Sequence, residues 1–184
     1  MMKYSDLQLE GLGSRKVFII AFYASAFIML SICSFALYES AREYLKTGTI
    51  VIGDVLVKTE FPFKGSPSLV TYLMITSIYS WFCVTRLAGE KVNAISGPVR
   101  SLFQLFALAI AIIALYEFVY NFVLWNSFFI DEVVRGEFQS EGVIIAYPNP
   151  RTPWNLMFAT KMTLAAFLIS AHAFYLITKT KKPL

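Results

Sequence analysis

Four long apolar stretches, separated by polar segments, are the main feature of the chain. Each stretch is close to or longer than ~18 residues, the length at which an apolar run is interpreted as a membrane-crossing helix. The first is too long for the core of a signal peptide and lacks an Ala-x-Ala exit, so we expect it to be retained. The pattern predicts an all-α membrane protein with four transmembrane helices in two hairpins, within a single membrane domain covering 1–184. The four predicted spans are residues 17–38, 68–87, 101–125 and 154–177.

Two long loops, residues 39–67 and 126–153, join the helices within each predicted hairpin. Each loop begins with a helical extension of the preceding span, over 39–47 and over 128–138. Glycines near the ends of these extensions, Gly48 and Gly136, are typical helix C-terminal residues.

Further along these loops the pattern becomes β-like. Residues 50–57 predict a tight hairpin, because two branched-aliphatic triplets flank Gly53-Asp54. Residues 143–147 predict a shorter strand in the second loop. A lone two-stranded hairpin is marginally stable in water. We therefore expect the two loops to pack together as one small cap of helix and strand.

Lys and Arg are distributed unequally between the two sides of the predicted bundle. The tails and the segment between spans two and three hold nine basic and three acidic residues, whereas the two long loops hold six basic and eight acidic ones. Because cytoplasmic flanks are enriched in Lys and Arg, both termini are predicted to be cytoplasmic in a multi-pass protein of the cell membrane. Trp125 and Trp154 then lie at the outer boundary, where indole rings are enriched.

The two predicted hairpins share short sequence similarities. Ala36-Leu37-Tyr38-Glu39 recurs as Ala114-Leu115-Tyr116-Glu117, and the spacing of Pro62 and Pro67 recurs in Pro148 and Pro153. These repeats favour an internal duplication of a two-span unit in parallel orientation, with an insertion in the second copy.

Composition supports the membrane interpretation and excludes other classes. The chain is 57% hydrophobic and 15% charged, whereas a soluble domain is about 45–50% apolar and about 25% charged. Its net charge of +4 forms no basic stripe, so nucleic acid is not an expected partner. Cys33 and Cys83 are predicted at different membrane depths and not in a disulfide. The sequence contains no phosphate-binding loop, dinucleotide motif or metalloprotease motif, and we predict no cofactor, no metal and no independent enzyme activity.

Glu117 and Lys161 are the ionisable residues farthest inside the predicted spans, each about seven residues or roughly 10 Å below the outer boundary. Charged groups at that depth face the protein interior and have a partner. The leading interpretation is a structural ion pair between spans three and four. A pair completed by another subunit and a proton or substrate relay are the alternatives.

Several polar side chains are candidates for contacts between helices. His172, the single histidine, lies near the cytoplasmic end of span four. One imidazole cannot build a bis-histidine haem or copper site, so a hydrogen-bonded interfacial role is predicted, with a ligand shared with a neighbouring subunit as the alternative. Small-residue pairs such as Ala107/Ala111 also indicate close helix packing. The candidate interface residues are Tyr72, Thr76, Ser80, Asn121 and His172.

Three function hypotheses remain open. The first is a small accessory or structural subunit that assembles or stabilises the catalytic subunits of a larger membrane complex, by analogy a respiratory or membrane monooxygenase enzyme. Its expected partners are other integral membrane subunits and the lipid bilayer. The second is a small transporter or channel using Glu117, Asn121 and Lys161. The third is a subunit that shares a cofactor ligand with a partner chain.

Overall fold

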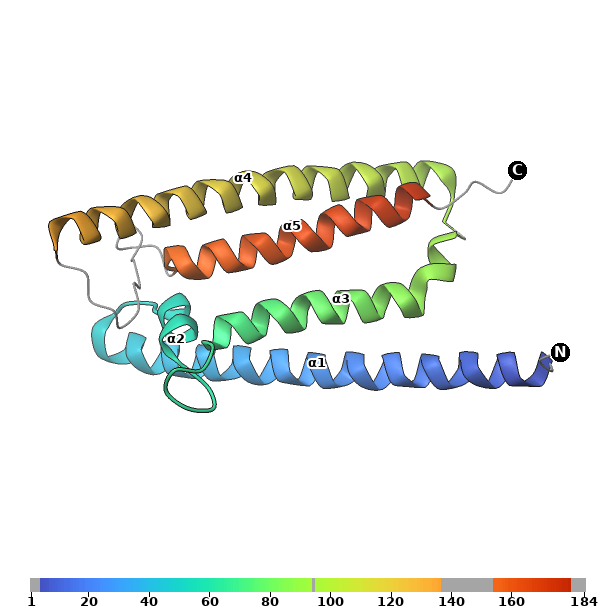
Figure 1. Ribbon diagram of the computed structural model, residues 1–184, viewed down its shortest axis with the longest axis horizontal. Helices are drawn as coiled ribbons and strands as arrows, with labels where there is room; N and C mark the ends of the chain where they lie inside the picture. The colour runs from blue at the N-terminus through green and yellow to red at the C-terminus, as the bar shows by residue number, and fades with distance from the viewer. Residues whose placement is uncertain (1–3, 94, 137–153, 180–184) are drawn as a thin grey trace.

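The computed structural model describes residues 4–93, 95–136 and 154–179, and these residues form an almost entirely helical structure. Four helices are long and one is short (Figure 1). The helices are α1 (Tyr4–Thr47), α2 (Ile52–Lys58), α3 (Leu69–Asn93), α4 (Gly97–Arg135) and α5 (Leu156–Lys179).

The long helices lie side by side in one row, in the order α1, α3, α5, α4 (Figure 1). In the described residues α4 contacts α5 alone among the helices, and α1 contacts α3 and α2. The chain direction alternates within each hairpin, whereas α3 and α5 run parallel at the centre. The row is therefore open: no helix at one edge contacts a helix at the other.

Three of the helices are long and apolar enough to cross a membrane: α4, α5 and residues 15–47 of α1. This makes the chain a multi-pass helical membrane protein. The second predicted span, residues 68–87, corresponds to α3, which is 25 residues long but less apolar than these three helices. Its polar side chains, among them Thr71, Thr76 and Ser80, explain the difference.

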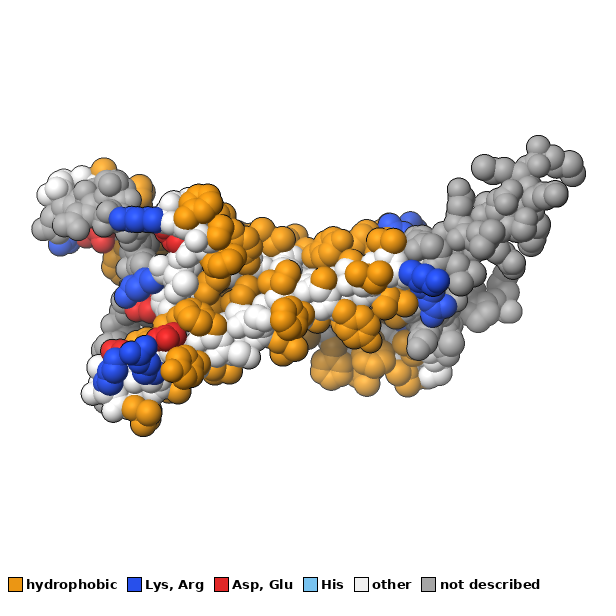
Figure 2. Space-filling view, turned by 90° about the horizontal axis from the view of Figure 1, so that it is seen from below, with side chains coloured by type: hydrophobic (Ala, Val, Ile, Leu, Met, Phe, Trp, Pro, Cys, Tyr) orange, Lys and Arg blue, Asp and Glu red, His pale blue; other side chains and the backbone are white. Residues whose placement is uncertain are grey.

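Figure 2 shows how side-chain types are distributed along the row. Hydrophobic side chains cover the middle of the visible face, and a group of Lys and Arg side chains lies toward the end opposite α2. Asp and Glu, together with further Lys and Arg, gather at the end that holds α2. We call this the α2 end; α1 and α4 finish there, and α3 and α5 begin there (Figure 1). The apolar band is what a helix surface facing hydrocarbon requires.

The predicted helical extensions are confirmed except for residues 137–138, which lie outside the described residues, and both end at the expected glycines. α1 continues to Thr47 and α4 to Arg135. Gly48 and Gly136 have φ angles of 74° and 72°, and the N–H of each bonds to a carbonyl of the preceding turn. Only glycine adopts this left-handed conformation without a Cβ penalty, which is why the helices stop there.

The predicted β-hairpin at 50–57 is wrong: Ile52–Lys58 is the short helix α2. A helix places Ile52, Val55 and Leu56 on one face, and all three join an apolar cluster with α1 and α3. Its backbone groups bond within the segment, which avoids open strand edges next to the bilayer. The predicted strand at 143–147 lies outside the described residues.

Candidate functional site: polar contacts between helices and an open groove

Lys161 and Glu117, the predicted ion pair, have other hydrogen-bond partners in this structure. The Lys161 ammonium donates to Thr71 Oγ1 on α3 at 2.7 Å. The Glu117 carboxylate accepts a long 3.4 Å bond from the Asn121 amide, on its own helix. The salt bridges of the described residues lie elsewhere, within single helices at the α2 end. The pairing of Glu117 with Lys161, direct or through a water, therefore stays a prediction.

His172 lies at the contact between the two central helices. The indole N–H of Trp81 on α3 donates to Nδ1 of His172 on α5 at 3.0 Å. An imidazole nitrogen that accepts a hydrogen bond carries no proton, so in the neutral ring the proton is on Nε2. Nδ1 then accepts the indole N–H and Nε2 carries the proton, so both ring nitrogens are occupied. This tautomer leaves His172 no free nitrogen for a shared metal or haem.

The remaining interface candidates have different environments. Ser80 is buried and shares a 2.6 Å hydrogen bond with Ser25 of α1. Thr76 bonds back to the Tyr72 carbonyl of its own helix at 2.7 Å. The Tyr72 hydroxyl donates to the Phe61 carbonyl in the α2–α3 loop at 3.0 Å. Of these three residues, Ser80 alone hydrogen-bonds a neighbouring long helix.

Small residues fill the contact surfaces between the long helices. Ala107, Ala111 and Ala114 are buried along α4, the helix whose helical neighbour is α5. Asn121, 1% exposed, continues the same stripe and donates to the Glu117 carbonyl at 2.6 Å. Small side chains let helix axes approach closely in lipid. The small-residue motif of α4 is thus used within the chain and is not available to another subunit.

Asn155, which the sequence reasoning did not single out, joins the two hairpins at the α2 end. Its amide donates to the Asp54 carboxylate of α2 at 2.9 Å, and its Oδ1 accepts the Phe158 N–H at 2.8 Å. The second bond is an N-cap, which satisfies one free donor of the first turn of α5. The sequence feature that could have predicted this cap is an Asn two residues after Pro153, directly before the apolar run of α5. Nothing local to residues 50–58 indicated the contact with Asp54.

Arg100 caps the C-terminal end of α5, at the opposite end of the row. Its guanidinium donates twice to the Ile177 carbonyl, at 2.7 and 3.0 Å. The last carbonyls of a helix have no partner within it and carry partial negative charge. An Arg in the first turn of α4 therefore stabilises the end of α5. From the sequence, Arg100 is expected only as one of the basic residues of the cytoplasmic side.

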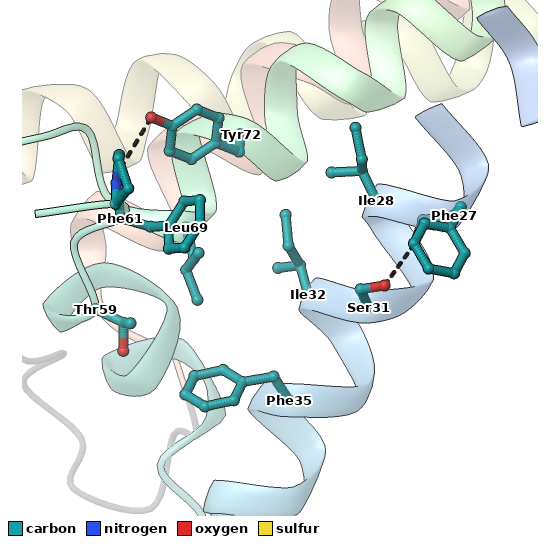
Figure 3. A pocket seen from close by; sticks show the side chains of 10 residues that line it. Phe27, Ile28, Ser31, Ile32, Phe35, Thr59, Phe61, Leu69 and Tyr72 are labelled. Carbon is teal, nitrogen blue, oxygen red and sulfur yellow. Dashed lines mark hydrogen bonds between the residues drawn. The ribbon is translucent and has the colours of Figure 1, made fainter. Parts of the chain in front are cut away.

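An apolar groove of about 650 Å³ opens between α1 and α3 near the α2 end. Figure 3 shows Phe27, Ile28 and Phe35 on α1 opposite Leu69 and Tyr72 on α3, with Phe61 at one end. The Ser31 hydroxyl in this wall donates to the Phe27 carbonyl at 2.9 Å. The Tyr72 hydroxyl is also bonded within the chain. Apart from the Thr59 hydroxyl at the edge of the groove, the wall is therefore effectively apolar. We call this the α1–α3 groove.

A second pocket of about 380 Å³ adjoins the groove, and both are bounded by Phe35 and Thr59. It is polar: Glu39, Glu43 and Asp54 line it with Lys58. We call it the acidic pocket. The lining is thus apolar in the groove, toward the middle of α1, and charged in the acidic pocket, toward the α2 end.

Comparison of the chain with models of known protein families, with curated proteins and with solved structures gave no match.

Proposed function

We propose that the chain is a non-catalytic accessory subunit that assembles or stabilises a larger complex in the cell membrane. The observation that carries the proposal is the open row of helices. In a closed bundle the apolar faces cover one another, whereas among the described residues α4 has a single helical neighbour and the short α2 is the one helix that lies across the row. Uncovered apolar faces suit contact with helices of other subunits. A respiratory or membrane monooxygenase complex remains the analogy for the type of enzyme.

A pair of tyrosines on α4 supports a protein partner at that edge. Tyr116 and Tyr120 stack at 6.4 Å between ring centroids and are 66% and 52% exposed. Neither hydroxyl hydrogen-bonds to any residue that the structure describes. A hydroxyl without a partner in an apolar medium costs roughly 2–7 kcal/mol, depending on the reference state. An acceptor on a neighbouring subunit would remove that cost.

We also propose that α3 is the fourth membrane span and that the two hairpins arose by duplication. In the row α1, α3, α5, α4, the second helix of each hairpin (α3 and α5) lies at the centre, and the first helix of each hairpin (α1 and α4) lies at an edge. A half-turn about an axis between the parallel α3 and α5 would exchange the hairpins. Helices α3 and α5 also begin in a similar way, since each directly follows a residue in an isolated β-bridge, Ser68 before α3 and Asn155 before α5. With both termini cytoplasmic, the α2 end is outside.

The transporter and shared-ligand alternatives have less support. A transport path through Glu117, Asn121 and Lys161 would require these side chains to face one route. Glu117 and Asn121 bond to each other on α4, whereas Lys161 bonds to α3 on the other side of α5. His172 accepts the Trp81 indole, which is an interfacial role and leaves no nitrogen for a cofactor in that tautomer.

The test is native gel electrophoresis of an epitope-tagged chain after extraction in mild detergent. We expect migration with other membrane polypeptides in a fixed ratio, and loss of that assembly for Tyr116→Leu combined with Tyr120→Leu. Tyr44→Leu is the matched control, because Tyr44 is 52% exposed but lies beyond the predicted span 17–38. Migration as a monomer or homo-oligomer would contradict the accessory role.

A further inference from the structure

We propose that the α1–α3 groove and the acidic pocket together bind one membrane lipid whose headgroup carries a cationic amine. An acyl chain would lie in the groove, and the headgroup would lie in the acidic pocket. This inference is independent of the accessory role, since it concerns the lipid-facing surface of the first hairpin.

The depth of the groove matches one leaflet of a bilayer. From Phe27 to Phe35 the wall extends eight residues along α1, or about 12 Å at ~1.5 Å per residue. One leaflet of a hydrocarbon core of roughly 30 Å is about 15 Å deep. Glu39 and Glu43 follow one and two turns later, where a headgroup begins. The change from apolar to charged lining therefore occurs at the level at which a lipid changes from chain to headgroup.

The volume of the groove favours a slender occupant over a helix. An α-helix with its side chains is about 10–12 Å across and rises about 5.4 Å per turn. A volume of about 650 Å³ would therefore hold less than two turns of a partner helix. Small-molecule sites of ~300–1,000 Å³ are mostly apolar with a few placed polar groups, as here.

The charges of the acidic pocket select the headgroup. Asp54 is paired with Lys58 at 3.3 Å, and Glu39 contacts Arg42 at 3.7 Å. Glu43 makes no ion pair with the described residues, and its carboxylate is the acceptor that we assign to the amine. The Lys58 ammonium, 59% exposed, has further donors for a lipid phosphate. Lipids with and without an amine both offer that phosphate to Lys58, so the contact between an amine and the Glu43 carboxylate is what distinguishes them.

Lipid retention can be measured by native mass spectrometry of the full chain in detergent mixed with phosphatidylethanolamine or phosphatidylglycerol at equal mole fraction. We expect preferential retention of phosphatidylethanolamine by roughly five-fold, the ratio expected of one partly exposed ion pair. Glu43→Gln should abolish the preference without emptying the groove. Ile28→Trp, which fills the groove, should reduce retention of both lipids.

Ile113→Trp is the matched control for Ile28→Trp: it makes the same change on α4, at a side chain 62% exposed and outside the groove. It should leave retention unchanged. Equal retention of the two lipids, or full retention by Ile28→Trp, would overturn the proposal.

Photo-crosslinking tests the competing occupant in native membranes. With benzoylphenylalanine in place of Phe35, which is already aromatic and lines the groove, an adduct of lipid mass on the chain supports the proposal. A band shift to a second polypeptide would overturn it and assign the groove to a partner helix.

Discussion

The indole N–H of Trp81 donates to Nδ1 of His172 across the contact between α3 and α5, at 3.0 Å. Ten residues before Trp81 on the same helix, Thr71 accepts from Lys161 of α5 at 2.7 Å. The two bonds are about three turns apart and fix the parallel register of the two central helices. They are the polar side-chain bonds through which α3 and α5 connect the two hairpins in the described spans.

Trp81→Phe should destabilise the contact between the hairpins. The substitution retains an aromatic ring but removes the donor, so the His172 Nδ1 lone pair remains unsatisfied. Hydrogen bonds between membrane helices average about 0.6 kcal/mol and reach about 1.7 kcal/mol, and we expect a loss in this range. Thermal unfolding in detergent measures it.

Trp154→Phe is the matched control, since Trp154 stacks on Phe158 with 5.7 Å between ring centroids and a phenyl ring retains that contact. A double-mutant cycle of Trp81→Phe with His172→Leu should show non-additive losses. Additive losses would contradict the hydrogen bond.

Asn155 variants separate its two bonds at the α2 end. Asn155→Ser retains an N-cap oxygen but removes the amide that reaches Asp54, whereas Asn155→Ala removes both. We expect Asn155→Ala to lower stability by about 0.5–2 kcal/mol more than Asn155→Ser, the usual worth of an N-cap. Unfolding midpoints of the two variants in detergent give the difference.

Asp54→Ala completes the comparison. It removes the same hydrogen bond and leaves the cap, but it also removes the Asp54–Lys58 ion pair, so it should be at least as damaging as Asn155→Ser. If Asp54→Ala is silent while Asn155→Ser is damaging, the contact between α2 and α5 is not stabilising.

The sequence predicts the helices of this fold well, because a long apolar run and a C-terminal glycine both act locally. Gly48 and Gly136 end their helices as expected, since the left-handed conformation is a property of one residue. The error at 50–57 has a tertiary cause. Gly53-Asp54 between branched residues is compatible with a turn or with the first turn of a helix, and packing of Leu56 against α1 and α3 selects the helix.

The candidate site was less predictable from the sequence than the helices, because its contacts depend on how the two hairpins pack together. His172 was recognised as interfacial, but its partner Trp81 lies 91 residues away and no local pattern connects them. The groove depends on the loop that places Phe61 beside Tyr72. A sequence periodicity describes the face of one helix, whereas a groove requires the spacing between two.

Cysteine labelling tests the proposed orientation. In a variant lacking Cys33 and Cys83, cysteine at Lys46 should react with a membrane-impermeant maleimide in intact cells. Cysteine at Lys16 should react only after permeabilisation, because basic flanks are retained in the cytoplasm. Labelling of the Lys16 position in intact cells would contradict the orientation with cytoplasmic termini.

The last prediction concerns Lys161, for which the structure gives Thr71 and the sequence gives Glu117 as partners. Thr71→Val preserves shape but removes the acceptor at 2.7 Å. A cycle of Thr71→Val with Lys161→Met should be strongly non-additive, because an ammonium without its acceptor at this depth is worse than a methionine. Assembled protein in membranes is the measurement, and Thr71→Ser, which retains a hydroxyl, should behave as wild type.

A parallel cycle of Glu117→Gln with Lys161→Met tests the predicted ion pair. Non-additive damage of smaller size is the expected result, since any coupling acts across the α4–α5 contact or through a water. Full additivity in this cycle, with non-additivity in the Thr71 cycle, would eliminate the ion pair and leave Thr71 as the anchor of Lys161. Glu117 would then be the group to test, beside Tyr116 and Tyr120, for contact with a neighbouring subunit.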